Sequence, residues 1–271
     1  IPAWDHARLD MSGTSPLKLS GMIDFVDDNG TRFEGRLDDA KGEWSGIPME
    51  NVTATISMKD QELEIKDFTA EVFNGKVIFS YNYNLAKKTG KMSLNIEDSD
   101  FAPLVQNLGF KDFSSKKPGS ISGDMIAALQ YNEKDELLMD GKGKMAVRDA
   151  NIFDIPVLKG FTDMMGTSVI SSEWGEISSA ECNFTLEKDH FFSDSIQTNG
   201  NAVALSAVGK YYWNTSESDF KVRAKILKNM LPFELLSKLS HPLSWALEAR
   251  IHGKGKDLEW EQGTGLKRLF K

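Results

Sequence analysis

The sequence predicts a mostly β protein: a long twisted antiparallel sheet, an open groove or partly closed, built from two repeats, with about three short helices. Three observations support this prediction. Apolar and polar side chains alternate along most of the chain, short turn sequences separate the alternating runs, and one pattern from the first half of the chain recurs in the second half. A period of two places successive side chains on opposite faces of a sheet, so each run indicates a strand with one apolar face.

The alternating runs follow one another from residue 52 onwards. Turn sequences such as Asn74-Gly75, Lys88-Thr89-Gly90 and Asn199-Gly200 lie between them. Connections this short join antiparallel strands. The apolar positions of these runs include Val52, Ala54, Ile56 and Met58, then Val77, Phe79, Tyr81 and Tyr83, then Met92 and Leu94, and later Leu205, Ala207, Tyr211, Phe220 and Val222.

Three helices are expected, near residues 100–109, 154–165 and 230–240. Each has an Asp or Asn near its cap position and a proline in its first turn, where the missing N–H of proline costs nothing. Each is short enough to need packing against the sheet for stability.

The repeat defines the expected organisation. Residues 56–63 align with residues 184–191, which sets the repeat offset (184 − 56 = 128). Self-alignment of any long β-meander is the alternative explanation. We expect N-terminal strands over 1–46 that continue from a missing upstream region, a first sheet-and-helix repeat over 47–118, connecting strands and a helix over 119–172, and a second repeat over 173–271, all in one continuous unit.

The composition disfavours several functional classes. The 271 residues carry a formal net charge of −8, which repels phosphate backbones, so we expect no nucleic-acid partner. The single cysteine, Cys182, excludes a disulfide within the chain and is interpreted as a small apolar strand residue. The four histidines have no partner at a metal-ligand spacing, and no catalytic motif is present, so we expect no enzyme, no metal and no cofactor.

Glycines in the stretch Gly141-Lys142-Gly143 do not lie between a strand and a helix start. They are therefore interpreted as strand glycines at a close backbone approach, and a phosphate-binding loop is the disfavoured alternative.

The apolar strand residues outnumber what three short helices can cover. Either the sheet closes on itself around a core, or part of its apolar face stays open as a groove. An acyl chain would suit such a groove, since each buried CH₂ contributes about 0.8 kcal/mol. The candidate lipid-contacting residues are Val77, Phe79, Tyr81, Tyr83, Met92, Leu94, Leu205, Ala207, Tyr211, Phe220 and Val222.

A family resemblance bears on this choice. Four segments resemble the AsmA-like proteins of Gram-negative envelopes. They are residues 68–80, 92–109 and 119–161, and the C-terminal segment from His241 to Trp260. The resemblance covers most of residues 47–271 and consists of strand, glycine and helix placements. It departs at Leu258-Glu259-Trp260, where family members often have a proline before the tryptophan.

The resemblance implies a periplasmic protein tethered to the inner membrane by an N-terminal anchor that is missing here. It also implies phospholipid transport to the outer membrane along a β-groove, with outer-membrane assembly factors as further partners. The chain does not begin with Met, and we expect it to be a piece of a longer protein.

Two other interpretations stay open at this point. One is a closed-core structural or adaptor domain in envelope assembly that binds no lipid. The other is a carbohydrate-binding β-domain, because tryptophans can stack on sugars, namely Trp44, Trp174, Trp213, Trp245 and Trp260.

Overall fold

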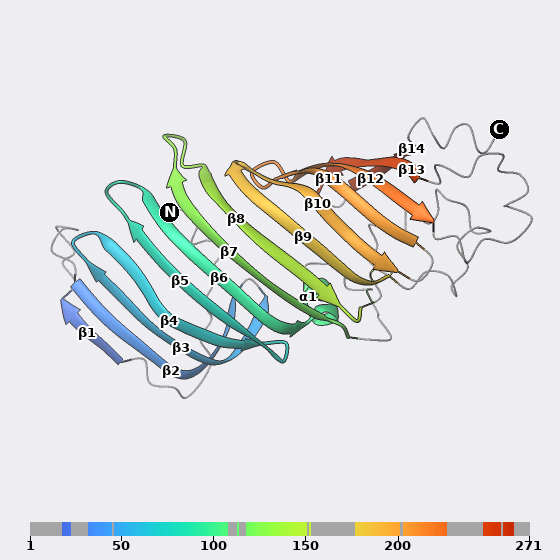
Figure 1. The fold of residues 1–271 in the computed structure, drawn as a ribbon. Coiled ribbons are helices and arrows are strands. Elements are labelled where there is room, and N and C mark those ends of the chain that lie inside the picture. Colours follow the sequence, from blue (N-terminus) through green and yellow to red (C-terminus); the bar gives the residue numbers. More distant parts are fainter. Residues whose placement is uncertain are drawn as a thin grey trace, which may run out of the picture.

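The computed structural model describes residues 18–22, 32–44, 46–107, 113, 118–150, 152, 177–200, 203–226, 246–255 and 257–262. These residues form a long band of strands with one short helix at its side (Figure 1). The elements are β1 (Lys18–Met22), β2 (Arg32–Trp44), β3 (Ile47–Lys59), β4 (Glu62–Val72), β5 (Gly75–Asn84), β6 (Thr89–Asp100), α1 (Phe101–Asn107), β7 (Ser120–Tyr131), β8 (Leu137–Arg148), β9 (Ile177–Lys188), β10 (His190–Gly200), β11 (Val203–Tyr212), β12 (Glu217–Ile226), β13 (Ala246–Lys254) and β14 (Asp257–Gln262).

All fourteen described strands belong to one sheet, and their order in the sheet is their order in the sequence. Every neighbouring pair is antiparallel, as short connections require. Among the described residues, β1 pairs only with β2 and β14 only with β13, so the sheet does not close into a barrel. The predicted mostly β fold with a long antiparallel sheet is confirmed.

The strand register agrees with the predicted repeat. Phe79 pairs with Leu94 between β5 and β6, and the residues at the repeat offset, Ala207 and Val222, pair between β11 and β12. The irregularity between Ile65 and Phe68 recurs at the same offset, between Ser193 and Ile196. Strands β4–β6 and β10–β12 therefore have the register of two copies of one unit.

Bulges interrupt β2, β3, β4 and β6 in the first half of the sheet. At each one a residue adopts a positive φ near 50°, a conformation that Asp and Asn tolerate better than most residues. A bulge adds one unpaired residue, bends the strand and increases its twist. The extra residue also shifts the alternation by one position, so residues an odd number apart can share a face. Ile65 and Phe68 thus pair with Tyr81 and Phe79 on the same face. The bulge residues are Asp39, Asn51, Asp67 and Asp98.

Helix α1 corresponds to the helix predicted near residues 100–109. Its first two backbone N–H groups donate to the carbonyl oxygens of Gly119 (3.0 Å) and Pro118 (3.1 Å). Phe101 and Val105 are buried, and the ring of Phe101 packs edge-on against Phe113 with centroids 6.0 Å apart. The other two predicted helices, near 154–165 and 230–240, lie outside the described residues.

Candidate functional site

One side of the described sheet carries a row of apolar residues and glycine from β4 to β11. Cross-strand pairing places Ile65, Tyr81, Met92, Ala127 and Gly141 in a single row. The same row continues through Leu186, Phe191 and Tyr211. We call this side of the sheet the apolar face. The described strands form a single layer, so no second sheet of described strands packs on it.

All eleven predicted lipid-contacting residues lie on this face. They form two groups, one on β5 and β6 and the other on β11 and β12, which occupy equivalent positions in the two copies. Strands β7 to β10 join the groups into one continuous surface. Contact with a lipid stays a prediction for Val77, Phe79, Tyr81, Tyr83, Met92, Leu94, Leu205, Ala207, Tyr211, Phe220 and Val222.

The prediction omitted the central strands of the face. Phe184 on β9 and Phe191 on β10 pack with ring centroids 4.9 Å apart, and Phe184 and Leu186 are buried there with Ala127. The alternation of Phe184 with Leu186 carries the same signal as the chosen runs, so these residues could have been found from the sequence.

Two glycines of β8 lie at the centre of the apolar face, where neighbouring atoms leave no room for a side chain. A Cβ atom on Gly141 would lie 2.2 Å from the carbonyl oxygen of Ile126, and one on Gly143 would lie 2.4 Å from Cζ of Phe184. Both distances are shorter than real Cβ contacts, so only glycine fits. The interpretation of Gly141 and Gly143 as strand glycines at a close approach is confirmed.

Aromatic rings form a ladder along β5. Phe79 packs edge-on against Phe68 and against Trp44, with centroids 5.9 Å apart in both cases, and stacks with Tyr81 at 6.2 Å. Since Trp44 ends β2 and Phe79 lies on β5, the tip of the β2–β3 hairpin folds over the apolar face, and Figure 1 shows the ends of these two strands curling out of the plane of the sheet. The ladder continues to Tyr83.

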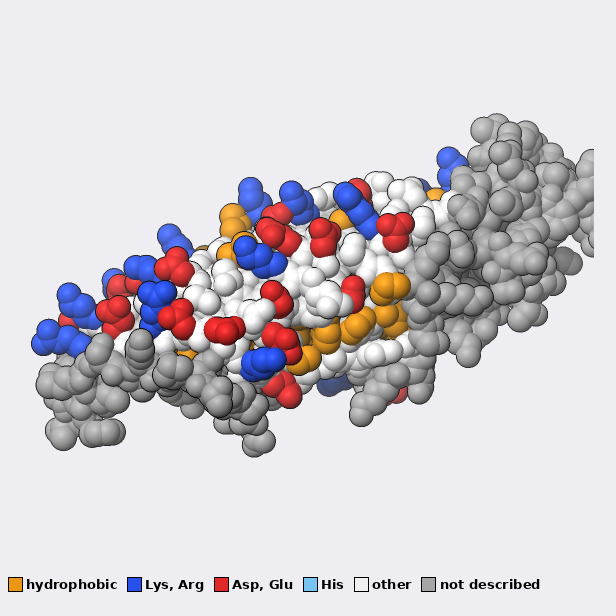
Figure 2. All heavy atoms as spheres, turned by 90° about the horizontal axis from the view of Figure 1, so that it is seen from below, with side chains coloured by type: hydrophobic (Ala, Val, Ile, Leu, Met, Phe, Trp, Pro, Cys, Tyr) orange, Lys and Arg blue, Asp and Glu red, His pale blue; other side chains and the backbone are white. Residues whose placement is uncertain are grey.

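The opposite side of the sheet is polar. Cross-strand ion pairs join Arg250 to Asp219 (2.8 Å) and Lys144 to Asp124 (3.2 Å), with about half or more of each side chain exposed. Exposed pairs of this kind contribute little to stability. In the view of Figure 2, acidic and basic side chains cover much of the described surface, and hydrophobic side chains gather in one narrow strip. The sheet therefore has two chemically different sides.

A shallow hollow of about 490 Å³ lies between β7 and β10. Its wall includes Phe192 and Ile126, and Ile126 is 55% exposed although it points away from the apolar face. Charged side chains surround these two residues, among them Lys142 and Glu187.

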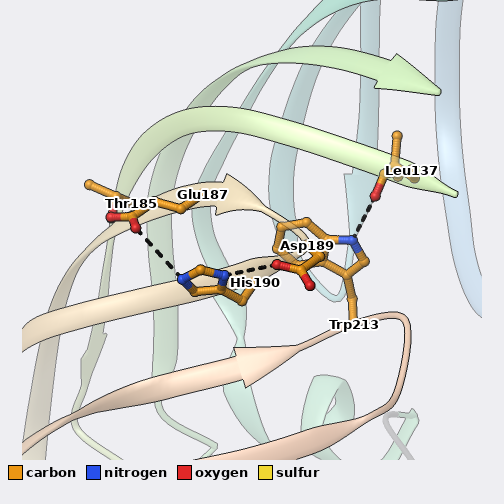
Figure 3. Close-up of polar contacts among 6 residues, drawn as sticks. All are labelled: Leu137, Thr185, Glu187, Asp189, His190 and Trp213. Carbon is orange, nitrogen blue, oxygen red and sulfur yellow. Dashed lines mark hydrogen bonds and ion pairs between the residues drawn. The ribbon is translucent and has the colours of Figure 1, made fainter. Parts of the chain in front are cut away.

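A group of polar contacts around His190 and Trp213 joins the ends of β8 to β11 (Figure 3). His190 Nδ1 is hydrogen-bonded to Asp189 Oδ1 at 3.0 Å, and His190 Nε2 lies 3.6 Å from Glu187 Oε2. The hydrogen bond from His190 holds the pKa of Asp189 below its usual value. Trp213 Nε1 donates to the carbonyl oxygen of Leu137 at 3.1 Å, which ties β11 to β8. These contacts could not be predicted from the sequence, because Leu137 and Trp213 lie 76 residues apart and His190 has no partner at a metal-ligand spacing.

Cys182 lies half-buried on the apolar face between Met145 and Ile196. Its thiol donates to Ser193 Oγ at 3.5 Å, and burial raises the pKa of the thiol. A raised pKa is the opposite of what activates a cysteine nucleophile. This environment agrees with the interpretation of Cys182 as a packed strand residue.

Within the described ranges, no group of three or more His, Cys, Asp and Glu residues is placed to hold a metal ion. No helix in the described part of the chain is long and apolar enough to cross a membrane. Comparison of the chain with protein-family models, with curated proteins and with solved structures finds no match. The functional interpretation therefore rests on the apolar face itself.

Proposed function

We propose that the protein is a lipid-handling module of an AsmA-like envelope protein, in which the apolar face carries acyl chains. The observation that supports the proposal is the predominantly apolar surface from β4 to β12 on a single layer of described strands. In this proposal the module works in the periplasm, tethered to the inner membrane by an anchor outside this chain, and supports phospholipid transport to the outer membrane.

The size of the face suits a long flexible ligand. Neighbouring strands lie about 4.8 Å apart, so the eight steps from β4 to β12 span roughly 38 Å. One leaflet of a bilayer's hydrocarbon core is about 15 Å thick, so an acyl chain fits within this span. Near the centre of the face the ring of Phe184 lies over Gly143, so a chain crossing there would contact an aromatic ring.

Partial exposure of the face also supports the proposal. Met145 on β8 and Tyr211 on β11 belong to the apolar face and are 39% and 38% exposed. Apolar surface in contact with water is less favourable than buried apolar surface by about 25 cal/mol per Å². A bound acyl chain would recover that free energy.

The runner-up is an adaptor domain, and the hollow on the polar side favours it. Ile126 and Phe192 offer an exposed apolar centre with a charged rim, which is a common composition of protein interfaces. This alternative needs no lipid on the apolar face.

Lipid extraction from the purified protein, followed by mass spectrometry, tests the proposal. The variant Ala207→Asp places a carboxylate on the apolar face, and its matched control Val208→Asp places one on the opposite side of the same strand, where Val208 is 44% exposed. We expect acyl lipid in the wild type and the control, and a several-fold lower load in Ala207→Asp. Thermal unfolding of all three proteins checks that each is folded.

Wild-type protein that carries no acyl lipid, or equal lipid loads in Ala207→Asp and Val208→Asp, would contradict the proposal. In that case, loss of a captured envelope protein from an Ile126→Asp variant would favour the adaptor interpretation.

A further inference from the structure

Three tyrosines meet at one end of the apolar face. Tyr81 and Tyr83 are stacked along β5 with centroids 6.0 Å apart, and Tyr83 packs edge-on against Tyr131, the last residue of β7, at 6.0 Å. Strand β6 lies between β5 and β7, and Gly90 is its residue in the row of Tyr83. A Cβ atom there would lie 2.9 Å from Cδ2 of Tyr83, so glycine lets the two rings meet above it.

Within the described part of the chain, the hydroxyl groups of these tyrosines are not among the buried polar atoms that lack a hydrogen-bond partner. Burial, together with the neighbouring phenols, raises the pKa of Tyr81 to about 12, and burial also raises the pKa of Tyr83 and of Tyr131. All three are therefore protonated donors at neutral pH. A phenol combines an apolar ring with a hydroxyl that can donate a hydrogen bond, so three of them at one end of the face can offer donors to an acceptor on a ligand.

The turns beside the tyrosines are tied together. Lys88, after β5, and Asp135, after β7, form an ion pair at 2.5 Å, and the backbone N–H of Tyr131 donates to the carbonyl oxygen of Lys88 at 3.0 Å. These contacts fix the turn between β5 and β6 beside the end of β7. The tyrosines thus lie at the border between the apolar face and a charged rim.

The cluster belongs to one copy of the repeat only. At the repeat offset, Tyr83 corresponds to Tyr211, but Tyr81 corresponds to Gly209. The second copy retains the apolar surface without the pair of phenols. The apolar surface is therefore common to both copies, whereas the tyrosine cluster is present in the first copy alone.

We propose that Tyr81, Tyr83 and Tyr131 bind the carbonyl group at the head of an acyl chain. The methylenes of that chain then lie along β5 and β6 toward Phe79 and Leu94. A carbonyl oxygen has two lone pairs and accepts two hydrogen bonds, so two of the three phenols can act on it at once. This inference rests on the proposed function and names how the ligand is oriented.

Two fluorescent probes separate the carbonyl contact from the apolar contact. Parinaric acid is a polyene fatty acid with a carboxyl group, and diphenylhexatriene is a hydrocarbon without an oxygen atom. We expect wild-type protein to bind both probes. Tyr83→Phe and Tyr131→Phe keep the rings and remove one hydroxyl each, so each variant should bind parinaric acid about three- to tenfold more weakly and bind diphenylhexatriene as the wild type does.

Tyr212→Phe is the matched control. Tyr212 lies on the same strand as Tyr211 but on the other side of the sheet, where its ring packs against His190 with centroids 5.1 Å apart. We expect this variant to bind both probes like the wild type. The methyl ester of parinaric acid should show the same losses as the acid in the Tyr83 and Tyr131 variants, because its carbonyl oxygen accepts the same bonds.

The outcomes distinguish failure of the proposed function from failure of the tyrosine–carbonyl contact. Wild-type protein that binds neither probe would overturn the proposed function together with this inference. Binding of both probes with unchanged affinities in Tyr83→Phe and Tyr131→Phe would overturn the inference alone. Equal losses for both probes, or losses confined to the free acid, would also overturn it, since they indicate ring packing or an effect of charge.

Discussion

Phe79 and Ala207 occupy the same position in two copies of one hairpin. Phe79 pairs with Leu94 and Ala207 pairs with Val222, and both members of the pair are shifted by the same offset (207 − 79 = 222 − 94 = 128). Their surroundings differ, however. Phe79 is 9% exposed and packed between Phe68 and Trp44, whereas Ala207 is only partly buried. The two copies share a register but have different packing.

Truncation at Phe79 should therefore be costly. Phe79→Ala is expected to lower the free energy of unfolding by about 3–5 kcal/mol, the usual range for a large buried aromatic residue. Ala207→Gly, at the equivalent position, should lower it by roughly 0.5–1 kcal/mol, as expected for glycine in a strand. Urea denaturation of both variants measures the difference, and similar losses would show that the copies are packed alike.

The bulge at Asp67 should tolerate glycine and reject a β-branched residue. Asp67 has a φ of 52°, which costs an ordinary L-residue about 1–2 kcal/mol. We expect Asp67→Gly to be near neutral and Asp67→Val to destabilise the protein by about 2 kcal/mol, again measured by denaturation. Thr69→Val, two residues further on the same strand, is the control and should have little effect. A stable Asp67→Val variant would show that the bulge does not require this conformation.

Stability should fall at high pH because of Tyr81. Its folded-state pKa of about 12 lies above the value of 10.0 for a free tyrosine. The phenol thus stays neutral in the folded protein while it ionises in the unfolded chain, so its contribution is complete below about pH 10 and is lost as the pH rises toward 12. Spectrophotometric titration should detect late ionisation of tyrosine, and Tyr81→Phe should remove the latest part of that transition together with part of the loss of stability. A protein whose five tyrosines all titrate near pH 10 would contradict this.

The bond between Trp213 and Leu137 should be worth about 1 kcal/mol. Trp213→Phe keeps an aromatic ring and removes the indole N–H that donates to the Leu137 carbonyl oxygen. Trp44→Phe is the control, because the contact of Trp44 with Phe79 involves only rings. Thermal unfolding should show a larger decrease for Trp213→Phe. The reverse order would mean that the bond does not hold β11 to β8.

Replacement of His190 or Cys182 should leave lipid binding unchanged, provided that the protein folds. Among the described residues, the polar contacts of His190 are with Asp189 and Glu187, and its ring packs against Tyr212. Measuring the lipid load of His190→Gln and Cys182→Ala at unchanged melting temperature checks this. A folded variant with an altered load would reveal a role for either side chain that packing does not explain.

The sequence predicted the sheet and its apolar face because alternation reports directly which residues share a face. Val77, Phe79, Tyr81 and Tyr83 needed no other information, and the self-alignment of the chain located the second copy. The bulges could not be predicted, since an aspartate in a left-handed conformation, such as Asp67, looks like any exposed polar residue in the sequence. Yet these bulges determine which residues lie on the apolar face, because each one shifts the alternation by one position.

Contacts between strands that are not neighbours in the sheet could not be predicted from the sequence either. The packing of Trp44 on Phe79 depends on how far the β2–β3 hairpin bends, and the meeting of Tyr83 with Tyr131 depends on the absence of a side chain at Gly90. Both contacts arise from sheet curvature, which a local pattern does not encode. The tyrosine cluster therefore became visible only in three dimensions.

The sequential strand order has a consequence for how this chain reaches its native state. Each described strand finds its partner in the strand that comes next in the chain, so most native contacts are local and loop-closure entropy is small wherever the connection is a short turn. Folding can then start at any hairpin and spread by addition of one strand at a time, as in repeat proteins. We expect denaturation to be gradual and to begin at the sheet edges, so that hydrogen exchange is fastest in β14 and slowest in the central strands.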